Sequence, residues 1–436
     1  MYPKDLSFGF GVAHFQLKSD HFHRRYGVVV RTAPDEVSIA HEDAWQTIVG
    51  GQNPFPRNAT FFKTPPGQPD NLVMTADPVA NARMRQVVMP AFTERAVMKQ
   101  EPVLKSYVDL LIEKLIDWFH WFAFDLSGQL CFGESFECLE NARSHPWIRM
   151  IFSFIKMTVL AAITRYYAGL ETLLMHFIPS SLRKKQTDHY AMGLERIHRR
   201  MASSHRDDFM APMLENNPDF ERMSVSEIES TMPIIVLAAS ETTATTLCGI
   251  VSALTRSTKQ LHRLEHEIRG TFDKEEQITL RAVQNLPFLN AVISEGLRMY
   301  HPVAGGLLRS APKGGATVCG CFLPEDTHVV VNSTAMSLSE DNFHRASEFL
   351  PERFLPADMQ PAEFENDCRG SQKPFGFGAR NCLGKSFALA EMRLVLARLV
   401  WKFDMSIAPG GHVEWGRLKT YVVVQKEPIN VIIRER

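Results

Sequence analysis

The chain has 436 residues, of which 45% are hydrophobic and 22% are charged, a composition typical of a globular protein with a sizeable core. A formal net charge of −1 gives no overall positive field, so we expect no nucleic-acid partner. The seven cysteines, which no secretory signal precedes, do not indicate a disulfide framework, and no apolar run reaches the roughly 18 residues that a membrane span needs.

The first predicted elements lie within residues 28–47. They are a short strand, a turn at Pro34 and Asp35, a second strand and the start of a helix. From about residue 78 to residue 300 the pattern is almost entirely helical, with long amphipathic runs such as "EPVLKSYVDLLIEKLIDWF". Gly- and Pro-rich strands follow over 303–335.

The C-terminal third continues with a proline-punctuated loop of about 340–381 and a predicted helix over 383–403. The final stretch, "VVVQKEPINVIIRE", predicts a closing hairpin. We therefore expect a mainly α-helical chain with a minor β-sheet region, forming a single large unit over residues 1–436. The expected β-rich parts are residues 25–50, 303–335 and 405–436.

The stretch "KPFGFGARNCLGKSF" places one thiol, Cys382, among glycines just before the predicted helix. Gly376, Gly378 and Gly384 permit a left-handed backbone or the close approach of another group. The N-terminus of the following helix and the nearby Arg380 favour a negative charge, so these surroundings favour a thiolate. A buried and chemically inert cysteine is the ordinary alternative.

Thiolates act as nucleophiles or as metal ligands. A papain-like nucleophile needs a histidine base, and no histidine is near this loop in the sequence, although a distant one could fold against it. A zinc site needs partner ligands, and the close pair Cys319 and Cys321 has one intervening residue rather than the usual two to four or so. A single thiolate on a glycine-rich loop suits the axial ligand of a haem.

This stretch resembles the haem-binding signature of the cytochrome P450 family, Phe-x-x-Gly-x-Arg-x-Cys-x-Gly. All of its fixed positions are matched, by Phe375, Gly378, Arg380, Cys382 and Gly384. The resemblance implies a cytochrome P450 fold that encloses haem b (iron protoporphyrin IX). It also implies that these residues surround the haem and that Cys382 is the axial ligand of its iron.

The segment "SEGLRMYHP" places Glu295 and Arg298 one helical turn apart, which by itself indicates an ordinary exposed ion pair. In the family that the chain resembles, such a pair is locked to the arginine of a Pro-Glu-Arg segment, and "FLPERFLP" supplies Arg353. The resemblance therefore implies a buried network that supports the thiolate loop and takes no part in the chemistry.

Residues 224–255, "SVSEIESTMPIIVLAASETTATTLCGIVSALT", predict a long apolar helix. It begins with a capping box, formed either by Ser224 with Glu227 or by Ser226 with Glu229.

In the middle of this helix, Glu241 and Thr242 interrupt the apolar run, and Ala238 lies on the same face as Thr242. One interpretation has the Thr242 hydroxyl bonded to the carbonyl four residues before it. The resemblance implies a catalytic pair instead, in which Thr242 hydrogen-bonds oxygen bound at the haem and Glu241 helps to relay protons. Ala239 stands where the family usually has glycine.

Haem propionates need cationic partners. The resemblance implies that Arg380 of the thiolate motif, Arg309 in "GGLLRSAP" and Arg85 in "NARMRQVVMPAF" fill this role, although each could instead be a solvated surface charge. Asn81 stands where the family often has Trp or His, so we expect one propionate contact to be weak or missing.

The resemblance covers the chain from about residue 25 to its end and is closest to fungal enzymes of secondary metabolism, such as the trichothecene-pathway hydroxylases. Such relatives begin with a membrane-anchoring helix and carry extra residues where this chain reads "LIEKLIDWFHWFAFDLSG" (111–128). We expect the anchor to be missing and this region to be shortened. The apolar region 151–179 is then a candidate for dipping into a membrane surface, and helices that roof the substrate site are the alternative.

The resemblance implies a haem-thiolate monooxygenase that oxidises a lipophilic small molecule with O2, in fungal terpenoid, polyketide or alkaloid biosynthesis. Electrons would come from NADPH–cytochrome P450 reductase, with cytochrome b5 as a further candidate donor. The expected location is the cytoplasmic side of the endoplasmic reticulum membrane, at its surface. Two alternatives stay open: the same fold catalysing a rearrangement or dehydration without O2, and an inactive haem-binding remnant.

Overall fold

The computed structural model describes residues 15–64, 68–113, 119–147, 159, 162, 164–165, 180–203, 207–411, 413–427 and 429–436. The chain divides into two compact units, one combining Met1–Pro56 with Thr242–Arg436 and the other spanning Arg57–Glu241. The predicted membrane-contacting region 151–179 lies outside the described residues, apart from single positions.

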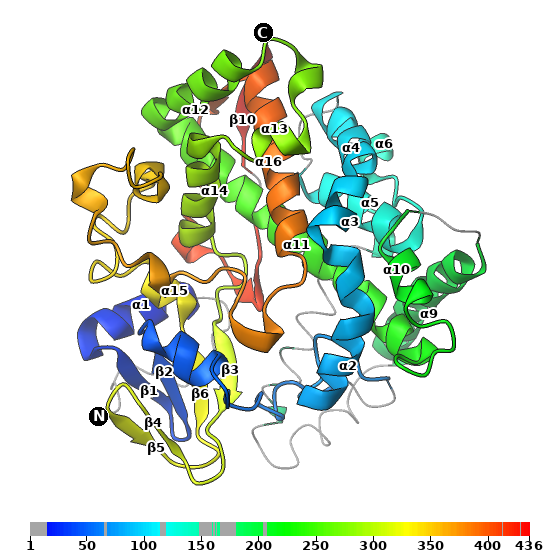
Figure 1. Cartoon of the computed structure of the whole chain (residues 1–436), viewed down its shortest axis with the longest axis vertical. Coiled ribbons are helices and arrows are strands. Elements are labelled where there is room, and N and C mark those ends of the chain that lie inside the picture. Colours follow the sequence, from blue (N-terminus) through cyan, green and yellow to red (C-terminus); the bar gives the residue numbers. More distant parts are fainter. Residues whose placement is uncertain are drawn as a thin grey trace. The chain divides into compact units, whose positions relative to one another are not determined.

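Helices dominate both units, as the hydrophobic periodicity predicts (Figure 1). The unit Arg57–Glu241 contains α2 (Pro78–Val88), α3 (Glu94–Lys99), α4 (Glu101–Glu113), α5 (Phe119–Phe132), α6 (Cys138–Asn141), α9 (Ser180–Ala202), α10 (Met210–Glu215) and the first part of α11 (Val225–Arg256). The other unit contains α1 (Phe15–Tyr26), the rest of α11, α12 (Thr258–Thr271), α13 (Leu280–Val283), α14 (Pro287–Met299), α15 (Ser333–Ser337) and α16 (Lys385–Lys402).

Strands that are far apart in the sequence form a four-stranded sheet in the order β1-β2-β6-β3. Its strands are β1 (Val29–Ala33), β2 (Glu36–Ile39), β6 (His328–Val331) and β3 (Leu307–Ser310). β1 and β2 form the antiparallel hairpin that the Pro-Asp turn predicts, β2 runs parallel to β6, and β3 is antiparallel to β6. Ile39, Val329 and Val331 are fully buried in one apolar cluster with Trp45 and Ile48, so this sheet has its own core.

Three two-stranded sheets complete the described β structure: β4 (Ala316–Val318) with β5 (Cys321–Leu323), β8 (Thr420–Tyr421) with β9 (Val423–Val424), and β7 (Phe403–Ile407) with β10 (Val431–Glu435). The prediction of a closing hairpin is wrong, because β10 pairs with β7, the strand that follows α16 directly. β7 buries Phe403 and Met405 on alternate positions. The apolar pattern of β10 was therefore correct, but its partner is not a neighbour in the sequence.

α11 begins with one of the two predicted capping boxes. The Ser224 backbone N–H donates to the Glu227 carboxylate at 2.9 Å, and the Glu227 N–H donates to the Ser224 hydroxyl at 3.3 Å. Among the described residues, α11 is also the helix whose length and composition would allow it to cross a membrane. Its most apolar stretch is 67% buried, and the core helix of a globular protein satisfies the same criterion.

A buried ionic network joins α14 to the loop that follows α15. The Glu295 carboxylate contacts Arg298 Nε at 2.7 Å and Arg353 Nε at 3.2 Å, and all three side chains are fully buried. Arg298 also donates to backbone carbonyls of that loop, and Arg353 pairs with Asp367. The structure thus brings the predicted trio together and adds a second carboxylate to it.

The segment after Asp367 leads straight into the predicted thiolate loop, 373–384, and is attached on two sides. Gln372 Nε2 donates to the carbonyl oxygen of Ser294, on α14, at 3.0 Å. Trp45 Nε1 donates to the Ser371 carbonyl at 2.9 Å. The network and these two bonds therefore fix the start of the loop to α14 and to the sheet core.

Gly378 is held against the π-helical turn Trp45–Val49. Its φ is +74°, and an added Cβ would lie 2.7 Å from the carbonyl oxygen of Val49. Gly376 has a similar φ of +72°, but an added Cβ there would lie 3.7 Å from Asn381 Cα, an ordinary contact distance. Both positions need glycine for the backbone, and only Gly378 also needs it for packing.

α16 follows the loop and packs against α12, α13 and α14 (Figure 1). Its carboxylic acid Glu391 is buried and hydrogen-bonds Thr243 of α11. Burial raises the pKa of Glu391 to about 8, because the charged form loses its hydration. Glu391 is therefore a neutral acid at neutral pH, a property that the amphipathic pattern of the helix did not reveal.

We expect Glu295→Gln to lower the free energy of unfolding by about 3–5 kcal/mol, because two buried guanidinium groups lose their shared anion. Urea denaturation followed by circular dichroism measures this. Glu348→Gln is the control, since Glu348 forms an exposed ion pair with Arg345 in the same loop and its loss has little effect. Equal effects of the two substitutions would contradict the role given to the network.

Gly378→Ala should destabilise the protein much more than Gly376→Ala. Both substitutions strain a left-handed backbone, but only Gly378→Ala also forces a clash with the Val49 carbonyl. Thermal unfolding of the two variants side by side makes the comparison. A Gly376→Ala protein as unstable as Gly378→Ala would show that the contact with the turn is unimportant.

Glu391→Gln should remove part of the pH dependence of stability. The folded pKa of about 8 lies above the ordinary 4.5, so the folded state binds this proton more tightly than the unfolded chain. Stability from this group is present below pH 4.5 and is lost as the pH rises toward 8, by at most about 1.4 kcal/mol per pH unit. Urea midpoints from pH 5 to pH 9 should fall less steeply in Glu391→Gln than in the wild type. The exposed Glu435→Gln should leave the slope unchanged, and an unchanged slope in Glu391→Gln would refute the assignment.

Candidate haem site

The loop 373–384 closes on itself and presents the thiol of Cys382 on an open face. The Cys382 backbone N–H donates to the Phe375 carbonyl at 2.7 Å, and the side chain of Cys382 is exposed and forms no disulfide. Gly384 is the N-cap of α16, with φ −77°. A left-handed backbone, one of the two possibilities predicted for these glycines, is present at Gly376 and Gly378 and absent at Gly384.

All seven cysteines are free, as the sequence predicts. Cys131 and Cys138 are buried, and burial raises the pKa of both thiols, that of Cys138 to about 12. Such thiols stay protonated and inert. Cys382 and Cys321 are the two exposed cysteines, and only Cys382 stands at the start of a long helix.

Two arginines of the same unit form a cationic pair. Arg309, on β3, is 5% exposed and donates to the Leu308 carbonyl at 2.9 Å. Burial and the positive charge of Arg380 lower the pKa of Arg309 to about 10. No carboxylate of the described residues forms an ion pair with Arg309. Two guanidinium groups at close quarters favour an anionic group between them, and the propionates of a haem fit this requirement.

The middle of α11 has one open face. Ala238 is exposed and Thr242 is half-buried, whereas Glu241 and Thr243 are buried. The hydroxyl of Thr246 donates to the Thr242 carbonyl at 3.1 Å, so the hydroxyls of this helix do bond to backbone oxygens one turn away. An open Ala238–Thr242 face on an otherwise buried helix fits a flat ligand that covers it.

Glu241 has a close polar partner within its own unit. His120 Nδ1, on the first turn of α5, lies 2.9 Å from Glu241 Oε1, and the carboxylate is fully buried. This contact could not be predicted from the sequence, because the two residues are 121 positions apart and no short motif links them. The region around His120 is the one expected to be shortened, and its residues 114–118 lie outside the described part of the chain.

Arg85 lies in the last turn of α2 and is half-buried. It belongs to the unit Arg57–Glu241, whereas Cys382, Arg380 and Arg309 belong to the other. Asn81, one turn earlier, is buried and donates from Nδ2 to the Leu72 carbonyl at 2.7 Å. This amide therefore holds the loop before α2.

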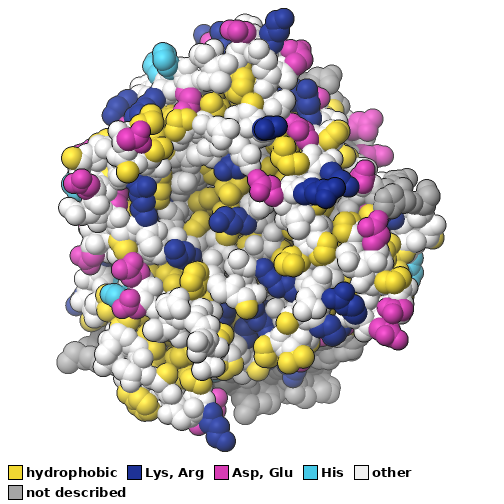
Figure 2. Space-filling view, in the orientation of Figure 1, with side chains coloured by type: hydrophobic (Ala, Val, Ile, Leu, Met, Phe, Trp, Pro, Cys, Tyr) yellow, Lys and Arg dark blue, Asp and Glu magenta, His cyan; other side chains and the backbone are white. Residues whose placement is uncertain are grey.

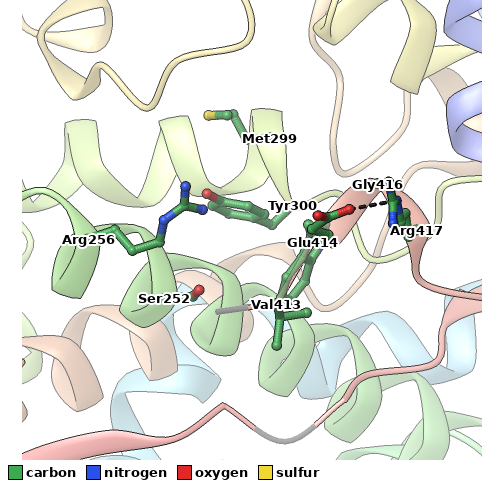
Figure 3. A pocket seen from close by; sticks show the side chains of 9 residues that line it. Ser252, Arg256, Met299, Tyr300, Val413, Glu414, Gly416 and Arg417 are labelled. Carbon is green, nitrogen blue, oxygen red and sulfur yellow. Dashed lines mark ion pairs between the residues drawn. The ribbon is translucent and has the colours of Figure 1, made fainter. Parts of the chain in front are cut away.

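A further concavity of about 340 Å³ lies elsewhere in the unit Thr242–Arg436 (Figure 3). Arg256 lies beside the ring of Tyr300, and Glu414 forms an ion pair with Arg417 at the rim. None of the residues that line it belongs to the predicted haem site. The face shown in Figure 2 carries side chains of both charge signs, in keeping with the low net charge.

Comparison with known proteins identifies the same family as the signature in the loop around Cys382. The family model "Cytochrome P450" matches residues 8–433. Cytochrome P450 monooxygenase efuB of Hormonema carpetanum is 35% identical over 428 residues, which cover 93% of this chain and 84% of the relative. Cytochrome P450 monooxygenase astA of Talaromyces wortmannii is 34% identical over 95% of this chain and 86% of its own length.

Another relative carries a more specific name. Versicolorin B desaturase of Aspergillus parasiticus is 35% identical over 91% of this chain and 82% of the relative. The family match covers nearly the whole chain, and the exposed thiol of the signature loop and a pair of arginines lie in the same unit, so these findings identify one family. The chain belongs to the cytochrome P450 family and is a haem-thiolate monooxygenase.

Proposed function

We propose that Cys382 is the axial ligand of the haem iron in this enzyme and that Arg309 and Arg380 hold the propionates. The observation that carries the proposal is the exposed thiol, which forms no disulfide and lies on a closed loop whose start is bonded to Trp45 and to Ser294 of α14. Phe375 supplies the carbonyl that closes the loop, Gly378 seats it against the turn Trp45–Val49, and Gly384 starts the helix whose N-terminus favours the thiolate. Arg85 is assigned as a third propionate partner by resemblance.

We assign the distal chemistry to the middle of α11. When bound, the haem activates O2 at its iron for insertion into the substrate. Thr242 is half-buried on the face of the helix that carries the exposed Ala238, and we assign its hydroxyl to hydrogen bonding at this face. Glu241, one residue before it, is buried beside His120, so its carboxylate is held out of contact with bulk water. Together they suit the delivery of protons to a water-poor site.

The substrate we propose is a lipophilic small molecule of fungal secondary metabolism. Ala238 and Thr242 of α11 and the segment 302–308 are the expected lining. That segment is fixed by a bond from the Val424 N–H to the Pro302 carbonyl at 3.1 Å. One relative is named for the desaturation of versicolorin B, so the product need not be an alcohol.

We propose NADPH–cytochrome P450 reductase as the electron donor, with cytochrome b5 as an additional one. We propose that Arg380, Lys385, Arg393 and Lys402 form a basic docking face for these partners. Arg393 donates to Asn290 at 2.7 Å and Lys402 pairs with Glu435 at 3.4 Å, whereas Lys385 is exposed. Lys385 is thus the most available cation for an acidic partner. We place the enzyme at the cytoplasmic surface of the endoplasmic reticulum membrane.

The ligand assignment is tested by the spectrum of the reduced, carbon-monoxide-bound protein. The wild type should show the Soret band typical of a thiolate-ligated haem, and Cys382→Ala should lose it, because no other sulfur replaces the ligand. Cys321→Ala is the matched control, since Cys321 is the other exposed thiol, and it should keep the band. Persistence of the band in Cys382→Ala, or its loss in well-folded Cys321→Ala, would overturn the assignment.

A further inference from the structure

We propose that His120 is a positioning residue for the oxidation reaction, which keeps the buried carboxylate of Glu241 ionised and in place. The inference rests on the proposed role of Glu241 in proton delivery, and it adds a residue that no motif of the family supplies here. Its basis is the contact between His120 Nδ1 and Glu241 Oε1 at 2.9 Å.

The two members of this pair differ in their access to water. The side chain of Glu241 is 0% exposed, and that of His120 is 22% exposed. The imidazole ring packs edge-on against Phe124, one turn further along α5, with 4.8 Å between the ring centroids. His120 is therefore fixed on its apolar side, meets water at its edge and presents Nδ1 to the carboxylate.

The energetic argument concerns the burial of charge. A carboxylate without contact to water is strongly disfavoured as an ion unless a cation or aligned donors compensate it. The 2.9 Å separation of His120 Nδ1 and Glu241 Oε1 is the distance of an ion pair when the imidazole is protonated. With His120 protonated, the pair has no net charge, and Glu241 can remain an ion that accepts and returns a proton.

Without the His120 imidazole, the buried carboxylate of Glu241 would lose a polar partner at 2.9 Å, and burial would favour its neutral form. Loss of His120 should therefore affect the outcome of the reaction before it affects the fold. Reduced oxygen would leave as hydrogen peroxide more often, because protons would reach the site at the wrong time. Electron uptake from NADPH, haem content and substrate binding do not depend on His120.

α11 offers a matched control pair. His198, on α9, forms an ion pair with Glu229, three helical turns before Glu241 and near the N-terminal end of α11. The side chain of His198 is 57% exposed, so the charge of Glu229 does not need it in the same way. Substitution of His198 removes a histidine–glutamate contact to α11 without touching the proposed proton path.

The experiment compares His120→Gln, His120→Lys, His198→Gln and Glu241→Gln in the reductase-coupled enzyme. The readout is the ratio of product to NADPH consumed, with hydrogen peroxide measured in parallel. His120→Gln should lower the ratio roughly tenfold, the size expected when one interaction with a charged group is lost. His120→Lys restores a cation and should recover part of the ratio, and His198→Gln should match the wild type. The carbon-monoxide spectrum should be normal in all four.

A second readout does not depend on turnover. Infrared difference spectra should show a protonated-carboxyl band in His120→Gln that is absent from the wild type and from the double variant His120→Gln/Glu241→Gln. The double variant also separates this band from that of the neutral Glu391.

The outcomes distinguish the inference from the proposed function. If Glu241→Gln retains a wild-type ratio of product to NADPH, the proton-delivery role of Glu241 is wrong. If Glu241→Gln lowers the ratio and His120→Gln does not, the role of Glu241 stands and that of His120 is wrong. The remaining outcome is that His120→Gln and His120→Lys lower stability to the same extent, keep the wild-type ratio of product to NADPH and show no new carboxyl band. In that case His120 is structural and the inference fails.

Discussion

The carboxylate of Glu295 is the buried anion shared by the two arginines of the network that precedes the predicted thiolate loop. It is fully buried, and both of its guanidinium partners are buried with it. Its oxygens also accept from the Leu350 backbone N–H at 2.8 Å, so the ion organises main chain as well as side chains. Because each buried charge is compensated only while the others are present, the three residues act as one part. Their position is transmitted through Arg353 and Asp367 to the segment that begins the loop.

The unit Thr242–Arg436 uses buried arginine in two different ways. Arg298 and Arg353 are saturated by carboxylates and carbonyls, so they are available for nothing else. Arg309 is also buried, but its hydrogen-bond partner is a neighbouring carbonyl, and the like charge of Arg380 acts on it. A guanidinium that is fully compensated serves the fold, whereas one that is buried beside a second cation is suited to an anionic ligand. The presence or absence of a carboxylate partner therefore distinguishes the arginines that stabilise the fold from the arginine suited to binding an anion.

The sequence predicted those parts of the structure that local patterns encode. The capping box at Ser224, the hairpin around Pro34 and the helix after Cys382 follow from short-range geometry and were confirmed. The family signature located the loop and the network because its spacing is fixed. The strand partner of β10 could not be predicted, since an alternating apolar pattern fits any free edge.

Other features of the site depend on contacts between distant segments. The burial of Glu391 in α16 and the pairing of His120 with Glu241 both join segments more than 100 residues apart. No propensity or short motif carries such information. Contacts between residues that are close in the sequence were therefore predictable. The pairing of buried charges from distant segments was not.

The central claim is that the buried Glu295 network holds the thiolate loop in place. Amide hydrogen exchange in the haem-loaded Glu295→Gln enzyme, followed by mass spectrometry, tests it most directly. The account predicts that the amides of residues 367–384 exchange faster than in the wild type. The exchange of α12 (258–271) should increase only as far as the loss of global stability explains. Wild-type protection of 367–384 in a destabilised Glu295→Gln protein would show that the loop is held by other contacts and would contradict the account.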